Sequence, residues 1–392
     1  MAEIDADETV RAAVCSAVSE GMHESEAPRI RARAHPGNIP NAAQSMALPA
    51  SVMTLAAPGG ICEPREGKGM EKRRLGNSGL EVAPLAFGGN VFGWTVDELT
   101  SFKLLDAFVA SGFNLIDTAD VYSRWVPDNQ GGESEAIIGR WLKRGGNRDK
   151  VVIATKVGME MEPGRKGLAR DHIMRSAEDS LRRLQTDYID LYQSHTDDHG
   201  TPQEETLDAY ARLIEQGKVR AVGASNFSAE RLSQSLQLSK ERSLPAYDSL
   251  QPLYNLYDRA DFEESLEPLC REKNVGVINY YSLASGFLTG KYRSESDLSK
   301  SARGAGVKKY LNARGFRILD ALDEVAQRRE STPARVALAW LIARPGVTAP
   351  IASATSLEQL NDLTEAIKLE LDETSLRLLN EASEWRREAG AA

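Results

Sequence analysis

Four side chains that could act together on a carbonyl group follow short apolar segments of the chain. Asp117 ends one such segment, and Tyr122 lies five residues later in a turn-like stretch. Lys156 ends a second segment, and His195 ends a third. The carboxyl ends of neighbouring parallel strands meet on one rim of a barrel. We therefore expect this carboxylate, phenol, ammonium and imidazole to lie in one site.

The residue types in this set suit proton donation to a carbonyl oxygen. An unperturbed phenol, with a pKa near ~10, is a poor acid at neutral pH. We expect the ammonium of Lys156 to favour the phenolate and so to lower the pKa of Tyr122. Asp117 would keep Lys156 charged and oriented, while His195 would donate a hydrogen bond to the carbonyl oxygen. Because proteins have no hydride donor of their own, a nicotinamide cofactor is implied.

Each of these residues also has a simpler structural explanation when it is taken alone. Asp117 could cap a helix, Tyr122 could pack within a loop, and His195 could be a satisfied polar side chain. Lys156 at the end of a buried strand is harder to explain, because lysine is rarely buried without a partner. The arrival of all four on adjacent strand ends favours a shared functional site.

The segments that must position these residues alternate between strand-like and helix-like patterns. Near-continuous apolar runs are typical of parallel strands buried on both faces, and apolar residues at helical spacing indicate amphipathic helices. The expected strands span residues 84–89, 113–117, 151–156, 188–193, 219–224, 247–251, 275–280 and 347–351. The expected helices span residues 97–110, 133–144, 171–184, 204–216, 228–239, 259–273, 313–329 and 356–367.

This alternation predicts the fold class α/β and a (β/α)8 TIM barrel, with an N-terminal β-hairpin at 73–82. Eight strand and helix units fit the length of the region from residue 70 onwards. The alternative is a doubly wound open sheet. Such a sheet should carry G-x-G-x-x-G after its first strand, but Gly88 to Gly93 has a different spacing. We therefore prefer the barrel.

The first 69 residues differ from the rest of the chain. Residues 1–69 show no lasting hydrophobic period beyond a possible short helix near 8–18, so we expect a disordered extension. Residues 70–392 would form the barrel domain. Met70 opens the first patterned segment and is an alternative natural start.

Composition narrows the classes of partner and compartment. The chain has 392 residues and a net charge of -9, which argues against nucleic acid or a membrane as the main partner. No apolar run approaches the length of a membrane helix. Three scattered cysteines, Cys15, Cys62 and Cys270, fit a reducing compartment. We expect a cytoplasmic protein without a metal site.

From about residue 70 to 370 the chain resembles the aldo-keto reductase superfamily. The resemblance implies a TIM barrel and NADPH-dependent carbonyl reduction of a small-molecule substrate. By matching position, Tyr122 would be the general acid, Lys156 and Asp117 would tune it, and His195 would orient the carbonyl. The motifs that carry the resemblance are at 117–122, 154–156, 188–195, 217–227 and 283–292.

The resemblance also implies a set of cofactor contacts. The nicotinamide amide would be held by Ser225, Asn226 and Gln251, with its ring stacked on Tyr280. Relatives commonly have Pro where this chain has Ser282. The pyrophosphate would lie on the loop after the seventh strand. The expected contacts there and at the adenosine end are Tyr281, Leu283, Gly286, Leu288, Lys291, Ser353, Thr355, Gln359 and Asp362.

One departure from the family pattern bears on cofactor choice. Thr355 stands where many relatives carry an arginine that binds the 2′-phosphate of NADP, and threonine brings no positive charge. NADPH is expected from the resemblance, with NADH possible.

Trp94 and Trp125 are expected to form an apolar wall around the substrate together with Tyr122. The long segment at 291–312, which includes Arg303, would fold over the cofactor as a lid.

The alternative function is that of a redox-sensing regulatory subunit similar to potassium-channel beta subunits. The sequence does not indicate an oligomeric state.

Overall fold

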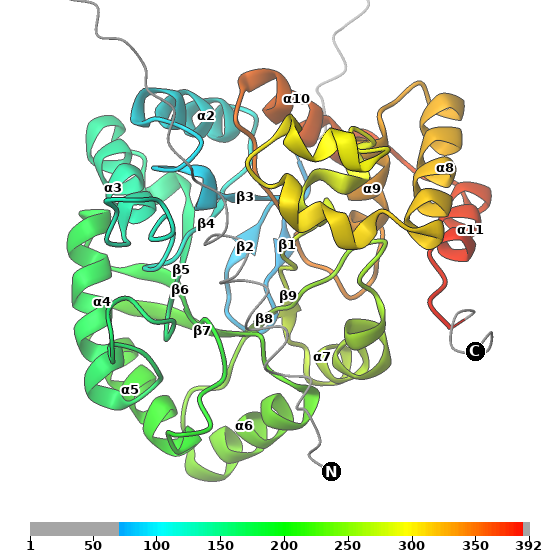
Figure 1. Cartoon of the computed structure of the whole chain (residues 1–392). Helices are drawn as coiled ribbons and strands as arrows, with labels where there is room; N and C mark the ends of the chain where they lie inside the picture. The colour runs from blue at the N-terminus through cyan, green and yellow to red at the C-terminus, as the bar shows by residue number, and fades with distance from the viewer. Residues whose placement is uncertain (1–69, 387–392) are drawn as a thin grey trace, which may run out of the picture. The chain divides into compact units, whose positions relative to one another are not determined.

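Eight parallel strands form a barrel in the computed structural model, which describes residues 70–386 (Figure 1). The expectations for residues 1–69 lie outside the described residues. The sheet order is β10-β3-β4-β5-β6-β7-β8-β9, and Ile351 donates a backbone hydrogen bond to Asn279, which joins the two ends. The predicted TIM barrel is confirmed. Its strands are β3 (Ala86–Gly88), β4 (Leu115–Asp117), β5 (Val152–Val157), β6 (Ile189–Ser194), β7 (Val219–Ser225), β8 (Ser249–Gln251), β9 (Gly276–Val277) and β10 (Ile351–Ala352).

Helices surround the barrel on its outside (Figure 1). Local sequence signals explain where several of them begin: the Ser228 side chain accepts a hydrogen bond from the Arg231 N–H, and Thr332 caps a helix whose first residue is Pro333. The helices are α2 (Glu98–Ala110), α3 (Glu133–Gly145), α4 (Arg170–Leu184), α5 (Gln203–Glu215), α6 (Ala229–Arg242), α7 (Glu267–Lys273), α8 (Ala313–Arg328), α9 (Pro333–Ile342), α10 (Leu357–Glu365) and α11 (Glu373–Ala382).

The prediction of eight helices was wrong, because α9 and α11 were not among them, although Thr332 and Pro333 in the sequence indicate where α9 begins. Seven of the ten residues of α9 are buried, so the helix is apolar on almost every side. A helix of this kind lacks the polar stripe that reveals amphipathic periodicity. In addition, the expected helix at 259–273 consists of a π-helical turn at Phe262–Leu266 followed by α7.

An N-terminal hairpin closes one end of the barrel. The strands β1 (Arg73–Arg74) and β2 (Glu81–Val82) pair antiparallel and lie across the middle of the barrel in Figure 1. Leu75 and Val82 are completely buried against the side chains that point into the barrel, among them Leu191. The predicted hairpin is confirmed. The carboxyl ends of the strands remain available for a site.

No helix within residues 70–386 is both long enough and apolar enough to cross a membrane.

Candidate active site

Three of the four predicted reactive side chains form one hydrogen-bonded group. Asp117 ends β4, and Lys156 lies in β5, the neighbouring strand. The ammonium of Lys156 lies 2.8 Å from a carboxylate oxygen of Asp117 and 2.7 Å from the phenol oxygen of Tyr122. The Tyr122 hydroxyl in turn donates to Asp117 at 3.1 Å. A phenol, an ammonium and a carboxylate therefore share one compact network.

Lys156 is completely buried, and its donors are all used. Besides Asp117 and Tyr122 it donates to the carbonyl of Thr118 at 2.8 Å, which accounts for the three N–H groups of an ammonium. Burial lowers the pKa of Lys156 below its ordinary value, while the charge of Asp117 opposes that shift. Asp117 also accepts a hydrogen bond from Gln251 at 2.8 Å. These partners fix the ammonium beside the phenol.

The expected lowering of the pKa of Tyr122 was wrong for this state of the protein. The enclosed position of the phenol raises its pKa well above the ordinary value, and the negative charge of Asp117 raises it further. Burial, and then the carboxylate of Asp117, both disfavour a phenolate at this position. The phenol is therefore held protonated, and Lys156 is placed to stabilise negative charge that develops on its oxygen during proton transfer.

His195 stands next to this network. It follows β6, and its ring centroid lies 6.0 Å from that of Tyr122. Its side chain makes no hydrogen bond within residues 70–386, and its Nδ1 atom is buried without a partner. Burial and the charge of Lys156 hold the pKa of His195 well below its ordinary value. A neutral imidazole with one free N–H can donate a hydrogen bond to a carbonyl oxygen.

The two predicted substrate residues lie beside the catalytic candidates. Trp125 packs edge-on against Tyr122, and Trp94 packs edge-on against Trp125 at 5.6 Å. The indole N–H of Trp125 is buried without a partner among the described residues. These rings give an apolar wall with one unused donor.

Arg303 is a residue of this site whose importance sequence reasoning missed. Its guanidinium lies over the ring of Trp94, 5.4 Å from the centroid, and its Nη2 atom is buried without a hydrogen-bond partner in the part of the chain that the structure describes. A buried cation without an acceptor is costly and points to an anionic ligand. The signal in the sequence was only an arginine within the predicted lid.

The predicted nicotinamide contacts cluster near His195. Asn226 donates to the backbone carbonyl of His195 at 2.9 Å and accepts a hydrogen bond from the Tyr280 hydroxyl at 2.7 Å. Ser225 donates to the carbonyl of Gln251 at 2.9 Å. The structure thus brings Ser225, Asn226, Gln251 and Tyr280 together around the reactive network.

The loop after β9 has several residues in the left-handed backbone region. Tyr281, Ala284, Ser285 and Gly286 all have positive φ angles. A methyl group at Gly286 would lie 3.3 Å from the Nζ atom of Lys291, so the position keeps the ammonium close to the backbone. Positive φ angles and a nearby ammonium suit a bound anion.

Two other predicted contacts on this loop differ in exposure. Leu283 is partly buried against the core, whereas Leu288 is completely buried. The Leu288 side chain cannot reach a ligand unless the core moves.

The predicted adenosine end is held together by its own hydrogen bonds. Thr355 donates to the side chain of Gln359 from both its backbone and its hydroxyl, at 2.9 and 3.0 Å. Asp362 pairs with Arg335 at 2.7 Å, a partner that sequence reasoning did not find. Ser353 donates to Asn90 at 2.7 Å. The charge of Asp362 is therefore already balanced by Arg335.

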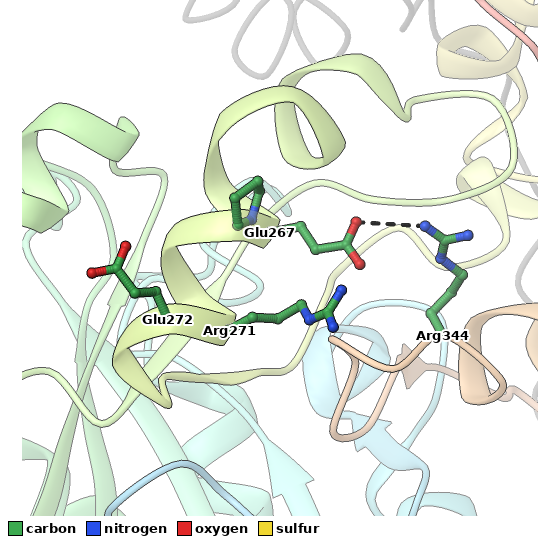
Figure 2. A pocket seen from close by; sticks show the side chains of 5 residues that line it. Glu267, Arg271, Glu272 and Arg344 are labelled. Carbon is green, nitrogen blue, oxygen red and sulfur yellow. Dashed lines mark hydrogen bonds and ion pairs between the residues drawn. The ribbon is translucent and has the colours of Figure 1, made fainter.

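A separate surface hollow lies beside α7. It has a volume of about 580 Å³ and includes an ion pair between Glu267 and Arg344 at 3.5 Å (Figure 2). None of the residues predicted for catalysis or cofactor binding lines it.

Comparison with known proteins agrees with the barrel fold. The sequence pattern of the Aldo/keto reductase family matches residues 84–384, and the chain belongs to this family. It is 35% identical to the oxidoreductase YrpG of Bacillus subtilis (strain 168) over 319 residues. These aligned residues cover 80% of this chain and 95% of YrpG.

Two further relatives differ in their named functions. The chain is 33% identical over 310 residues to the L-glyceraldehyde 3-phosphate reductase of Escherichia coli (strain K12), covering 76% of this chain and 88% of that protein. It is 32% identical over 308 residues to a probable voltage-gated potassium channel subunit beta of Arabidopsis thaliana, with coverage of 76% and 91%. The family and its oxidoreductases identify this chain as an NAD(P)H-dependent oxidoreductase that reduces carbonyl groups.

Proposed function

We propose that the protein reduces a small aldehyde or ketone to an alcohol, with Tyr122 as the proton donor and NADPH as the preferred cofactor. The bound nicotinamide supplies the hydride to the carbonyl carbon. The observation that carries the proposal is the contact of the Tyr122 hydroxyl with both Lys156 and Asp117, at 2.7 and 3.1 Å. Tyr122 protonates the carbonyl oxygen, and Lys156 stabilises the negative charge that develops on the phenol.

His195 and the tryptophan wall orient the substrate in this proposal. The neutral imidazole donates a hydrogen bond to the carbonyl oxygen, which polarises the bond before the proton moves. Trp94 and Trp125 cover the apolar part of the substrate and exclude water. Their position beside Tyr122 supports this role.

Lys291 and Arg303 are proposed to hold the cofactor pyrophosphate. The close approach of Lys291 to Gly286 and the unpartnered guanidinium of Arg303 support a bound anion. Ser225, Asn226 and Gln251 present amide and hydroxyl groups that match a carboxamide, and Tyr280 presents a ring. The residues present therefore fit a nicotinamide dinucleotide.

A panel of aldehydes and ketones, including 4-nitrobenzaldehyde, tests the proposal with NADPH and with NADH. Wild type should oxidise the cofactor. In Tyr122→Phe, kcat should fall by a factor of about 10² to 10⁴, while the variant should still bind NADPH in a fluorescence titration. Tyr188→Phe is the matched control, because Tyr188 stacks on Arg148 and Arg220 outside the site. Equal, slow turnover by wild type and Tyr122→Phe across the panel would instead favour a cofactor-binding regulatory subunit.

A further inference from the structure

A buried carboxyl group behind the reactive network has no role in the proposed reaction. Asp120 lies in the loop after β4, three residues beyond Asp117, and is 1% exposed. Both of its carboxylate oxygens are buried without a hydrogen-bond partner within residues 70–386. Its backbone N–H points to the carbonyl of Lys156, at 3.4 Å. An ionised carboxylate without donors in such a place is costly.

The neighbouring cations are committed to other acceptors. The three donors of Lys156 go to Asp117, Thr118 and Tyr122. The titratable and charged groups that face Asp120 are Glu135 from α3, Lys156 from β5, Arg183 from α4, Tyr192 from β6 and Tyr210 from α5.

Arg183 donates its Nε–H to Glu135 at 2.7 Å and reaches Ser180 at 3.3 Å. Glu135 also accepts a hydrogen bond from Thr155 at 2.5 Å. The Tyr192 hydroxyl, like the carboxyl of Asp120, is buried without a partner among the described residues. A proton on Asp120 is therefore the simplest way to remove its uncompensated charge.

The electrostatics of the cluster agree with a neutral carboxyl. Burial, and then the charge of Glu135, raise the pKa of Asp120 to about 8, although Arg183 and Lys156 act in the opposite direction. The pKa of Tyr122 lies well above its ordinary value and that of His195 well below. Neither of these two groups changes protonation in the mildly alkaline range.

We propose that Asp120 is a positioning residue that acts through Lys156: its neutral form supports carbonyl reduction, and its ionised form slows the reaction. The proposal rests on the proposed function. An ionised Asp120 would add a second negative charge beside that of Asp117. This charge would attract the ammonium of Lys156, and it would disfavour the negative charge that must develop on Tyr122.

The pH dependence of kcat in wild type and in Asp120→Asn separates Asp120 from Lys156 as the titrating group. The asparagine keeps the shape and cannot ionise, so we expect it to retain the neutral-pH kcat and to lose the alkaline decline centred near the pKa of about 8. If Lys156 caused the decline, removal of a neighbouring carboxylate would lower its pKa and move the decline to lower pH. That outcome, or an unchanged profile, would overturn the proposal.

Thermal unfolding gives a second test that needs no substrate. The pKa of Asp120 is about 8 in the folded chain and 3.8 in the unfolded chain. The contribution of this group to the stability of wild type therefore decreases as pH rises from 3.8 to about 8. The difference in Tm between Asp120→Asn and wild type should therefore grow over that interval and then level off. A difference that does not change with pH would overturn the proposal.

Asp128→Asn, which changes an exposed carboxylate in the segment between β4 and α3, is the matched control. Failure of the proposed function would appear as turnover that does not depend on Tyr122. Failure of the Asp120 proposal would leave that turnover intact.

Discussion

The ammonium of Lys156 forms an ion pair at 2.8 Å with Asp117, and the two side chains are 0% and 2% exposed. Such a pair is favourable mainly because each charge compensates the other in a place that water does not reach. Removal of one partner is therefore expected to affect both the fold and the reaction.

Lys156→Met should destabilise the protein by about 3 to 5 kcal/mol, because it leaves the charge of Asp117 buried and uncompensated. The double variant Asp117→Asn with Lys156→Met should recover part of this loss. Urea unfolding of wild type, both single variants and the double variant measures the coupling. Strictly additive losses would show that the two charges do not depend on each other. In either variant that lacks Lys156, kcat should fall even at pH values where the protein remains folded.

The proximity of the four reactive side chains could be predicted from sequence because the barrel imposes a simple geometry. Asp117 and Lys156 end or interrupt apolar strands, and adjacent parallel strands bring such positions together on one rim. The pKa of Tyr122 could not be predicted in the same way. Its direction depends on whether Lys156 or Asp117 dominates in an enclosed space, which only the distances and the burial show.

Asp120 and Arg303 show the limit of the same argument. An aspartate in a loop and an arginine in a long surface segment are usually solvated, so their residue types carry little information. Their importance comes from burial without a partner, which depends on the packing of several elements. The helix α9 was missed for a related reason, since its apolar residues cover nearly its whole circumference.

Gly286→Ala should weaken NADPH binding. Gly286 has φ +92°, which strains any residue with a Cβ atom, and the added methyl would lie 3.2 Å from Cε of Lys291. Strain of about 1 to 3 kcal/mol in the loop corresponds to roughly a 5- to 150-fold rise in Kd. Quenching of protein fluorescence by NADPH measures this directly. Gly306→Ala is the control, because a methyl there meets nothing within 4 Å. An equal effect of both substitutions would contradict the proposal that the loop around Gly286 binds the cofactor phosphates.

Thr355→Arg should increase the preference for NADPH over NADH. The threonine hydroxyl and N–H are both directed to Gln359, and neither brings positive charge to a 2′-phosphate. A charge-assisted hydrogen bond of about 1.5 to 3 kcal/mol would raise the ratio of kcat/KM for the two cofactors by roughly tenfold or more. Thr355→Met lengthens the side chain without charge and controls for size. An unchanged ratio in the arginine variant would place recognition of the 2′-position elsewhere.

Asp248→Asn should stabilise the protein at neutral pH. Asp248 precedes β8, and burial raises the pKa of its carboxyl from 3.8 to about 6, although a hydrogen bond with the backbone of Val222 acts in the opposite direction. Because the folded pKa is the higher one, this group favours the folded state below pH 3.8 and loses that contribution as pH rises through about 6. The asparagine variant avoids the loss, and we expect it to be more stable than wild type by about 3 kcal/mol at pH 7. Urea unfolding should show the difference growing between pH 4 and 6 and constant above that range. The exposed Asp187→Asn is the control. If Asp248→Asn were no more stable than wild type at pH 7, burial of the Asp248 charge would carry no cost.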